Sequence, residues 1–145
     1  MKPLLAIGLG NTLMGDDGVG CAVADRLAAD PRLPDDVEVI CGGTDLLRYA
    51  EAIEGRRRVV VVDAVQDGAE PGTVSVIGDA DDRQEHAHYL SVGQAIKLLQ
   101  MTTPARFTLL GVSVESVTVG EGLSPAVANC VDGIVERALE ELRGD

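Results

Sequence analysis

A glycine-rich segment near the start of the chain, residues 8–20, most constrains the possible folds. It contains five glycines and the adjacent carboxylates Asp16 and Asp17, follows the apolar run at residues 4–7, and leads into a helical pattern of apolar residues. A strand, a glycine-rich loop and a helix in this order are typical of the junctions that build active sites in α/β proteins. The segment therefore predicts an α/β fold with a functional site after the first strand.

The chemistry of this loop argues against a bound nucleotide. A dinucleotide-binding fingerprint requires glycine at its sixth position, which is Leu13 here. Phosphates are held by backbone N–H groups and a positive helix end, and Asp16 and Asp17 would oppose them with negative charge. The loop is better suited to a cation, and we assign Asp17 to metal binding and Asp16 to helix capping.

Two further side chains can complete a metal site with Asp17. Asp63 follows four consecutive valines at the end of a predicted buried strand, where parallel sheets commonly place functional carboxylates. His88, one of two histidines, stands just ahead of an apolar-periodic helix. Two carboxylates and an imidazole suit a divalent transition metal. From the residues alone, His88 is as well explained as a solvated histidine in an acidic loop as it is as a metal ligand.

The rest of the chain alternates strand-like and helix-like segments, which predicts a largely parallel sheet covered on both faces. We expect strands at 3–8, 37–41, 58–63, 73–77 and 107–114, and helices at 18–29, 45–54, 89–100 and 125–143. The link before residue 73 is too short for a crossover helix, so the fourth strand should run antiparallel to its neighbour. Because Asp17 and Asp63 can share an ion only if strands one and three are adjacent, we expect the order 2-1-3. The predicted fold class is α/β, a single-domain three-layer sandwich over residues 1–145 with a twisted five-stranded sheet.

Several polar segments have structural interpretations. Ser124 is expected to cap the last helix, with Pro125 in its first turn. The three arginines at 56–58 indicate a solvated edge before a buried strand. The segment 42–44, Gly-Gly-Thr, favours either a turn with a helix cap or backbone pairing with an extended peptide, and the sequence does not separate the two.

The cysteines predict no covalent framework. Cys21, Cys41 and Cys130 are an odd number, widely separated, and lack a Cys-x-x-Cys spacing, so neither a disulfide framework nor a structural zinc site is indicated. Cys41 and Cys130 are expected to be small core residues. Cys21 follows the glycine loop, but no histidine lies nearby in the sequence to activate it as a nucleophile.

Charge and composition limit the partners. The chain has 145 residues and a formal net charge of −12, which disfavours binding to nucleic acid or to an anionic lipid surface. A metal ion or a cationic peptide is a better match. The four apolar residues after Pro3 are too few for a signal peptide, and no run approaches transmembrane length. We expect a cytoplasmic monomer that does not bind membranes.

Seven short motifs also carry a family resemblance that covers nearly the whole chain. They are Gly8-Leu9-Gly10-Asn11, Gly15-Asp16-Asp17-Gly18, Gly42-Gly43-Thr44, Val62-Asp63-Ala64, Pro71-Gly72-Thr73, His88-Tyr89-Leu90-Ser91 and Leu110-Gly111-Val112. In order and approximate spacing they resemble the motifs of the hydrogenase maturation proteases. Those endopeptidases trim the C-terminus of the large subunit of nickel-iron hydrogenases.

The resemblance implies a function and a set of site residues. It implies a nickel-recognising endopeptidase that acts on the precursor of the large subunit after nickel insertion, with nickel carried by the substrate. By position, Asp17, Asp63 and His88 would contact the metal and form the catalytic site, with Asp16 as an additional candidate. Many members have Ser-Pro before the histidine, whereas this chain has His86 followed by an alanine, so His86 is a rival ligand. The alternatives are a non-catalytic metal-binding chaperone or checkpoint module that uses the same ligands, and a small nucleotide-binding domain.

Overall fold

The computed structural model describes residues 1–77, 87–115 and 117–144, except for the side chains of residues 77 and 87–91. Its strands are β1 (Leu4–Gly8), β2 (Val37–Cys41), β3 (Arg58–Val65), β4 (Val74–Ile77) and β5 (Arg106–Ser113). Its helices are η1 (Gly15–Gly18), α1 (Val19–Ala28), η2 (Leu46–Tyr49), α2 (Ala50–Ile53), α3 (Ala87–Gln100), α4 (Pro125–Ala128) and α5 (Val131–Arg143), where η denotes a 3-10 helix. The predicted alternation of strands and helices is confirmed.

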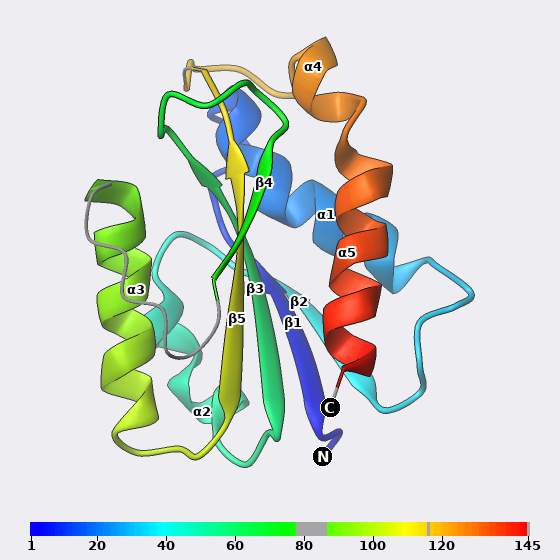
Figure 1. Ribbon diagram of the computed structural model, residues 1–145, viewed down its shortest axis with the longest axis vertical. Coiled ribbons are helices and arrows are strands. Elements are labelled where there is room, and N and C mark those ends of the chain that lie inside the picture. Colours follow the sequence, from blue (N-terminus) through cyan, green and yellow to red (C-terminus); the bar gives the residue numbers. More distant parts are fainter. Residues whose placement is uncertain (78–86, 116, 145) are drawn as a thin grey trace.

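The strands form one five-stranded sheet in the order β2-β1-β3-β5-β4 (Figure 1). β1 pairs in parallel with both β2 and β3, and β3 pairs in parallel with β5. β4 runs antiparallel to β5. The predicted 2-1-3 order and the antiparallel fourth strand are therefore both confirmed, and the carboxyl ends of β1 and β3 lie side by side.

Helices cover both faces of the sheet (Figure 1). Alternate residues of the central strands pack under α1 and α5 on one face, and the intervening residues pack under η2, α2 and α3 on the other. This follows from the two-residue repeat of a strand, because strands buried on both faces need apolar residues at nearly every position. β3 shows this clearly, since all eight of its residues are buried. The predicted three-layer α/β architecture is confirmed.

Several predicted element boundaries were wrong, and the expected helix 45–54 is divided into η2 and α2. The expected helix 125–143 is divided into α4 and α5, because Cys130 N donates to Val127 O, 3.0 Å away, in a tight turn between them. β3 extends two residues past Asp63 to Val65, since β5 continues beside it and supplies hydrogen-bond partners.

The expectation of a solvated arginine edge at 56–58 holds for Arg57, which is exposed, and was wrong for Arg56 and Arg58. Arg56 is 5% exposed and Arg58 is 8% exposed. The Arg56 guanidinium donates to Glu38 Oε1 at 2.6 Å, to Lys2 O at 2.7 Å and to Ala52 O at 2.7 Å. Because one guanidinium carries five fixed donors, it can join three chain segments at the amino end of the sheet.

No helix in the described residues is long and apolar enough to cross a membrane.

Candidate functional site

The glycine-rich loop leaves β1 at Gly8 and is anchored to both neighbouring segments. Leu9 N donates to Val62 O of β3 at 2.9 Å, and Gly10 N donates to Gly43 O, just beyond β2, at 2.9 Å. Gly10 has φ +129°, and a Cβ at this position would lie 1.9 Å from the carbonyl oxygen of Asp17. The loop therefore folds back tightly enough that only glycine fits where it meets Asp17.

Asp17 lies in η1, which contacts β3. Its Oδ2 accepts a hydrogen bond of 2.8 Å from Asn11 N, so the loop that precedes the carboxylate also orients it. The residue is half-buried at the carboxyl edge of the sheet. The loop therefore fixes the direction of this half-buried carboxylate.

Asp16 has a different role from the one predicted. Its side chain makes no capping hydrogen bond to η1 or α1. Instead, Oδ1 accepts from Ser124 N at 2.7 Å, and Oδ2 accepts from Ser124 Oγ at 2.8 Å. Ser124 is the N-cap residue of α4 and Pro125 lies in its first turn, as predicted, but the Ser124 side chain makes no capping hydrogen bond. The pair joins η1 to the start of α4 and uses both oxygens of the Asp16 carboxylate.

Asp63 lies in β3 at the point where β1 has ended. Gly8, the last residue of β1, pairs with Val62, so Asp63 is the first residue of β3 beyond that strand. Its neighbours two positions away, Val61 and Val65, belong to the core under α3, and strand alternation places Asp63 on that same face. Asp63 is 5% exposed, and its Oδ1 accepts from Ala64 N at 2.9 Å.

His88 lies in the first turn of α3, but its side chain is outside the described residues, and His86 lies entirely outside them. α3 runs opposite to β5, so it begins at the carboxyl edge of the parallel strands and covers the face that holds Asp63 (Figure 1). Within the described residues, no group of three His, Cys, Asp or Glu side chains could hold a metal. The shared site of Asp17, Asp63 and His88 stays a prediction.

Comparisons with known proteins identify the family. The model of the hydrogenase maturation protease family matches residues 21–141. A hydrogenase expression/formation protein of Rhodobacter capsulatus is 33% identical, over 97% of this chain and 71% of its own length. The chain belongs to the hydrogenase maturation protease family. The predicted family resemblance is thereby confirmed.

Solved structures of family members share the fold. The hydrogenase maturating endopeptidase HybD from Escherichia coli has a TM-score of 0.83 at 28% identity, covering 97% of this chain and 91% of its own. The NiFe hydrogenase maturation protease HybD from Thermococcus kodakarensis has a TM-score of 0.76 at 28% identity, covering 97% and 99%. The family relationship establishes a protease role in hydrogenase maturation, and the chain is a hydrolase of the endopeptidase type.

In this family member the segment 42–44 does not cap the helix that follows it, and its pairing with an extended peptide stays a prediction. Gly42 N donates to Gly8 O at 2.7 Å, and Gly43 N donates to the hydroxyl of Tyr49 at 3.0 Å. η2 is capped by Asp45, whose carboxylate accepts from Leu47 N at 3.0 Å. The segment continues the pairing between β2 and β1, and Gly43 O accepts from Gly10 N of the glycine-rich loop.

The prediction for the cysteines was wrong. Cys21 and Cys41 form a disulfide with a Cα–Cα distance of 5.0 Å. Cys41 pairs with Gly8, and the first turn of α1 packs on Gly8, so the strand order brings the two cysteines together. Cys130 is free and half-buried against the core.

Sequence reasoning also missed Ser113. This residue of β5 is fully buried and pairs with Val65, so it lies on the same face of the sheet as Asp63. Its Oγ has no hydrogen-bond partner among the described residues. A serine within a run of apolar strand residues is the signal that could have drawn attention to it.

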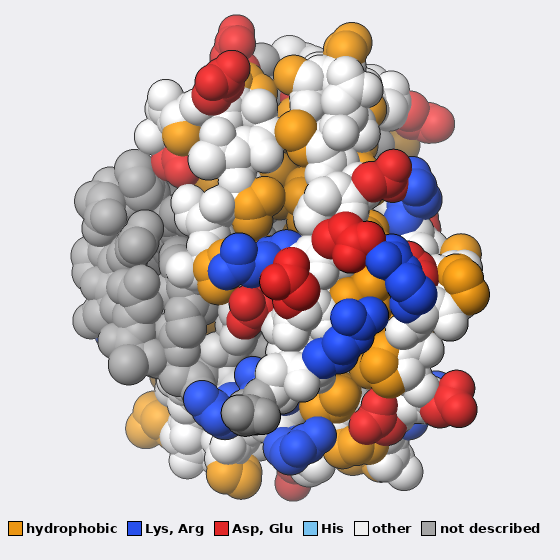
Figure 2. Space-filling view, turned by 45° about the vertical axis from the view of Figure 1, so that its right-hand side comes forward, with side chains coloured by type: hydrophobic (Ala, Val, Ile, Leu, Met, Phe, Trp, Pro, Cys, Tyr) orange, Lys and Arg blue, Asp and Glu red, His pale blue; other side chains and the backbone are white. Residues whose placement is uncertain are grey.

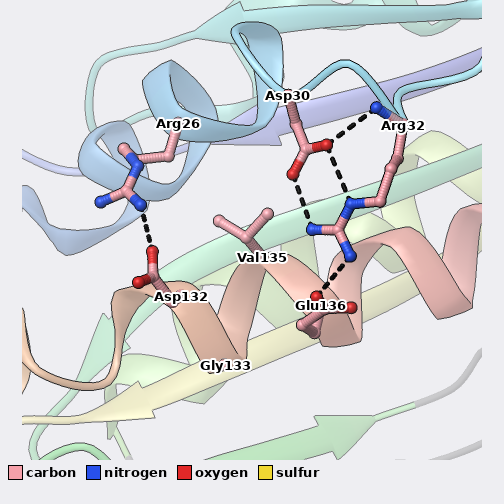
Figure 3. Close-up of a pocket in the computed structure, with 7 residues that line it drawn as sticks. All are labelled: Arg26, Asp30, Arg32, Asp132, Gly133, Val135 and Glu136. Carbon is pink, nitrogen blue, oxygen red and sulfur yellow. Dashed lines mark hydrogen bonds and ion pairs between the residues drawn. The ribbon is translucent and has the colours of Figure 1, made fainter.

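A cavity of about 390 Å³ lies apart from this site, between the end of α1 and α5 (Figure 3). Its charged side chains are paired with each other. Arg26 forms an ion pair with Asp132, and Arg32 binds both Asp30 and Glu136. These pairs join α1 and the loop that follows it to α5 on the surface, and none of the carboxylates of the candidate site lines the cavity.

The Asp30–Arg32 pair beside this cavity gives a prediction about how stability depends on pH. The side chain and then the backbone N–H of Arg32 donate hydrogen bonds to Asp30 and lower the pKa of that carboxyl from 3.8 to about 2. Because the pKa is lower in the folded state, the pair contributes its full stability above about pH 4 and loses it as the pH falls toward 2. NMR titration should find a midpoint near pH 2, and Arg32→Gln should raise it toward 3.8. An unchanged midpoint in that variant would contradict the assignment.

Proposed function

We propose that this chain is an endopeptidase that removes the C-terminal extension of a nickel-iron hydrogenase large-subunit precursor after nickel insertion. Asp17, Asp63 and His88 recognise the bound nickel. The observation that carries the proposal is the placement of Asp17 and Asp63 at the open carboxyl ends of adjacent strands in a chain of this family. The Thermococcus kodakarensis relative supports the class of partner, since it is a NiFe hydrogenase maturation protease.

The donor set fits nickel that arrives with the substrate. Two carboxylates and one imidazole occupy three coordination positions and leave others for groups of the precursor. Among mid-row divalent ions, such ligands bind nickel more strongly than iron, so the site can distinguish a loaded precursor. Asp16 is a poor candidate for a general base, because both of its oxygens already accept hydrogen bonds from Ser124.

The charge of this edge supports a cationic peptide segment as the part that enters. The loops at 9–18, 42–45, 66–73 and 114–124 contain Asp and Glu but no Lys or Arg. In Figure 2 the uppermost part of the molecule, which corresponds to this edge, carries acidic side chains, and the Lys and Arg side chains lie lower. Complementary charge accelerates association and orients the partner.

The decisive experiment incubates the protein with a nickel-loaded precursor large subunit and measures the mass of the precursor. We expect loss of a C-terminal fragment with many turnovers per enzyme. A matched reaction with nickel-free precursor under chelation should give no fragment. Stable binding without shortening of the precursor would instead indicate the chaperone or checkpoint function.

The isolated enzyme is expected to bind nickel weakly. Three ligands with open positions lack the closed four-ligand shell that makes a structural metal site tight. Isothermal titration should therefore give a dissociation constant far above the nanomolar range, about micromolar or weaker. Free nickel should restore cleavage of an empty precursor only after loading it. Sub-nanomolar affinity of the enzyme alone would show that the metal is resident and not carried by the substrate.

The two histidines can be separated by substitution. His88→Ala should reduce cleavage by more than about 100-fold, because it removes the only nitrogen ligand proposed. His86→Ala is the matched control and should keep cleavage within about threefold of the unmodified enzyme. Rates of fragment release measure both, and the reverse pattern would move the ligand to His86.

A further inference from the structure

The disulfide between Cys21 and Cys41 lies beside the glycine-rich loop that carries Asp17. Cys21 is in the first turn of α1, and Cys41 is the last residue of β2. The residues after Cys41 hold the glycine loop, since Gly42 N donates to Gly8 O and Gly43 O accepts from Gly10 N. The disulfide therefore fixes covalently a segment that otherwise meets the loop through backbone hydrogen bonds.

The loop held in this way positions Asp17. Gly10 lies directly against the Asp17 backbone, and the next residue, Asn11, donates its N–H to Asp17 Oδ2 at 2.8 Å. A continuous series of contacts thus joins Cys41 to the Asp17 carboxylate through Gly43 and Gly10. Any change in the mobility of Cys41 is transmitted over these few residues.

The two sulfurs differ in access. Cys21 is 3% exposed, whereas Cys41 is exposed. Thiol–disulfide exchange begins when an external thiolate attacks an accessible sulfur, so Cys41 is the point of attack and Cys21 is the leaving thiolate.

The surroundings of Cys21 also accommodate the reduced state. Its Sγ lies 3.3 Å from Gly42 O and 3.6 Å from Gly8 O. Once the sulfur is protonated, these carbonyls can accept its S–H. The same packing therefore serves both the disulfide and the dithiol.

We propose that the Cys21–Cys41 bond is a reversible redox tie that sets how firmly the Asp17 loop is held. A dithiol reductant supplies two electrons and two protons, the protein disulfide becomes two thiols, and the reductant becomes a disulfide. A small disulfide oxidant reverses the reaction. In the oxidised form the segment 41–45 holds the loop in place, and in the reduced form both segments open more often.

A redox titration tests whether the tie is reversible. The full chain is equilibrated in mixtures of reduced and oxidised glutathione, unfolded and alkylated, and the labels are counted by mass. We expect one label per chain, on Cys130, under oxidising mixtures and three under reducing mixtures. One label in every mixture would show a permanent structural bond, and three in every mixture would show that the bond does not form; either result overturns the proposal.

Hydrogen exchange tests the effect on the site. After reduction, exchange in residues 9–12 and 41–45 should be about tenfold faster, and the melting temperature should fall by about 10 °C. Cys41→Ser should reproduce the faster exchange without reductant, and Cys130→Ser is the matched control that should keep the redox response. Reduced wild-type protein provides the same comparison if Cys41→Ser does not fold. Equal exchange in both redox states would overturn the proposal.

The consequence for catalysis rests on the proposed function. Reduction should raise the KM for nickel-loaded precursor about tenfold and change kcat little, because a less ordered Asp17 must be fixed during binding. A KM that is the same in both states would overturn this link between the tie and the site. If neither redox state cleaves the precursor, the proposed function fails, while the labelling and exchange measurements still decide whether the tie exists.

Discussion

Replacing Asp63 by Asn should lower the rate of precursor cleavage by more than about 100-fold and leave the fold intact. Asn has nearly the same shape, and its carbonyl oxygen can still accept the hydrogen bond from Ala64 N. What it loses is the negative charge, which the proposed nickel contact requires. Asp17→Asn should have a similar effect, because its amide oxygen can still accept from Asn11 N.

The matched control for these substitutions is Glu70→Gln. Glu70 is exposed and lies in the link that follows β3, so its replacement changes the net charge by the same amount near the same edge. Cleavage by this variant should stay within about threefold of the wild-type rate, as expected for screened surface charge. Circular dichroism would verify the fold of each variant. Wild-type cleavage by Asp63→Asn would exclude Asp63 from the site.

Gly20→Ala is expected to lower the stability of the fold strongly. Gly20 lies in the first turn of α1, where the helix passes directly over the ends of β1 and β3. A Cβ at this position would lie 2.3 Å from Leu9 O, 2.4 Å from Val62 O and 2.8 Å from Leu9 N. All three atoms are backbone, so the clash can be relieved only by moving α1 away from the sheet. We expect the free energy of unfolding to fall by about 3 kcal/mol or more.

Gly133→Ala, also in a helix, is the control for Gly20→Ala and should have the opposite effect on stability. Gly133 lies within α5, is exposed, and would place its Cβ in open space. Because alanine has less conformational freedom in the unfolded chain, this substitution should raise the free energy of unfolding by about 0.5–1 kcal/mol. Urea unfolding of both variants measures the two changes. Equal stability of Gly20→Ala and wild type would mean that α1 does not depend on this close approach.

Local patterns were sufficient to predict the framework of the site. The strand-loop-helix junction at Gly8 and the valine run before Asp63 located two parallel strands, because burial on both faces leaves a distinctive apolar signal. The requirement that Asp17 and Asp63 share an edge then gave the correct 2-1-3 order. The family resemblance favoured His88, already a candidate from its position, as the third ligand, and no described side chain tests that contribution.

Pairings between distant residues were decided only by the tertiary structure. Asp16 accepts a hydrogen bond from Ser124, 108 positions away. Cys21 forms a disulfide with Cys41, because parallel pairing aligns the end of β2 with Gly8, which lies under the first turn of α1. Arg56 is buried because three segments converge on its guanidinium. Sequence periodicity reports which side of an element is buried, but it carries no information about which partner the chain brings to that side. The sequence by itself therefore determined the fold and the edge at which the carboxylates lie, and the packing of distant segments decided how those carboxylates are held.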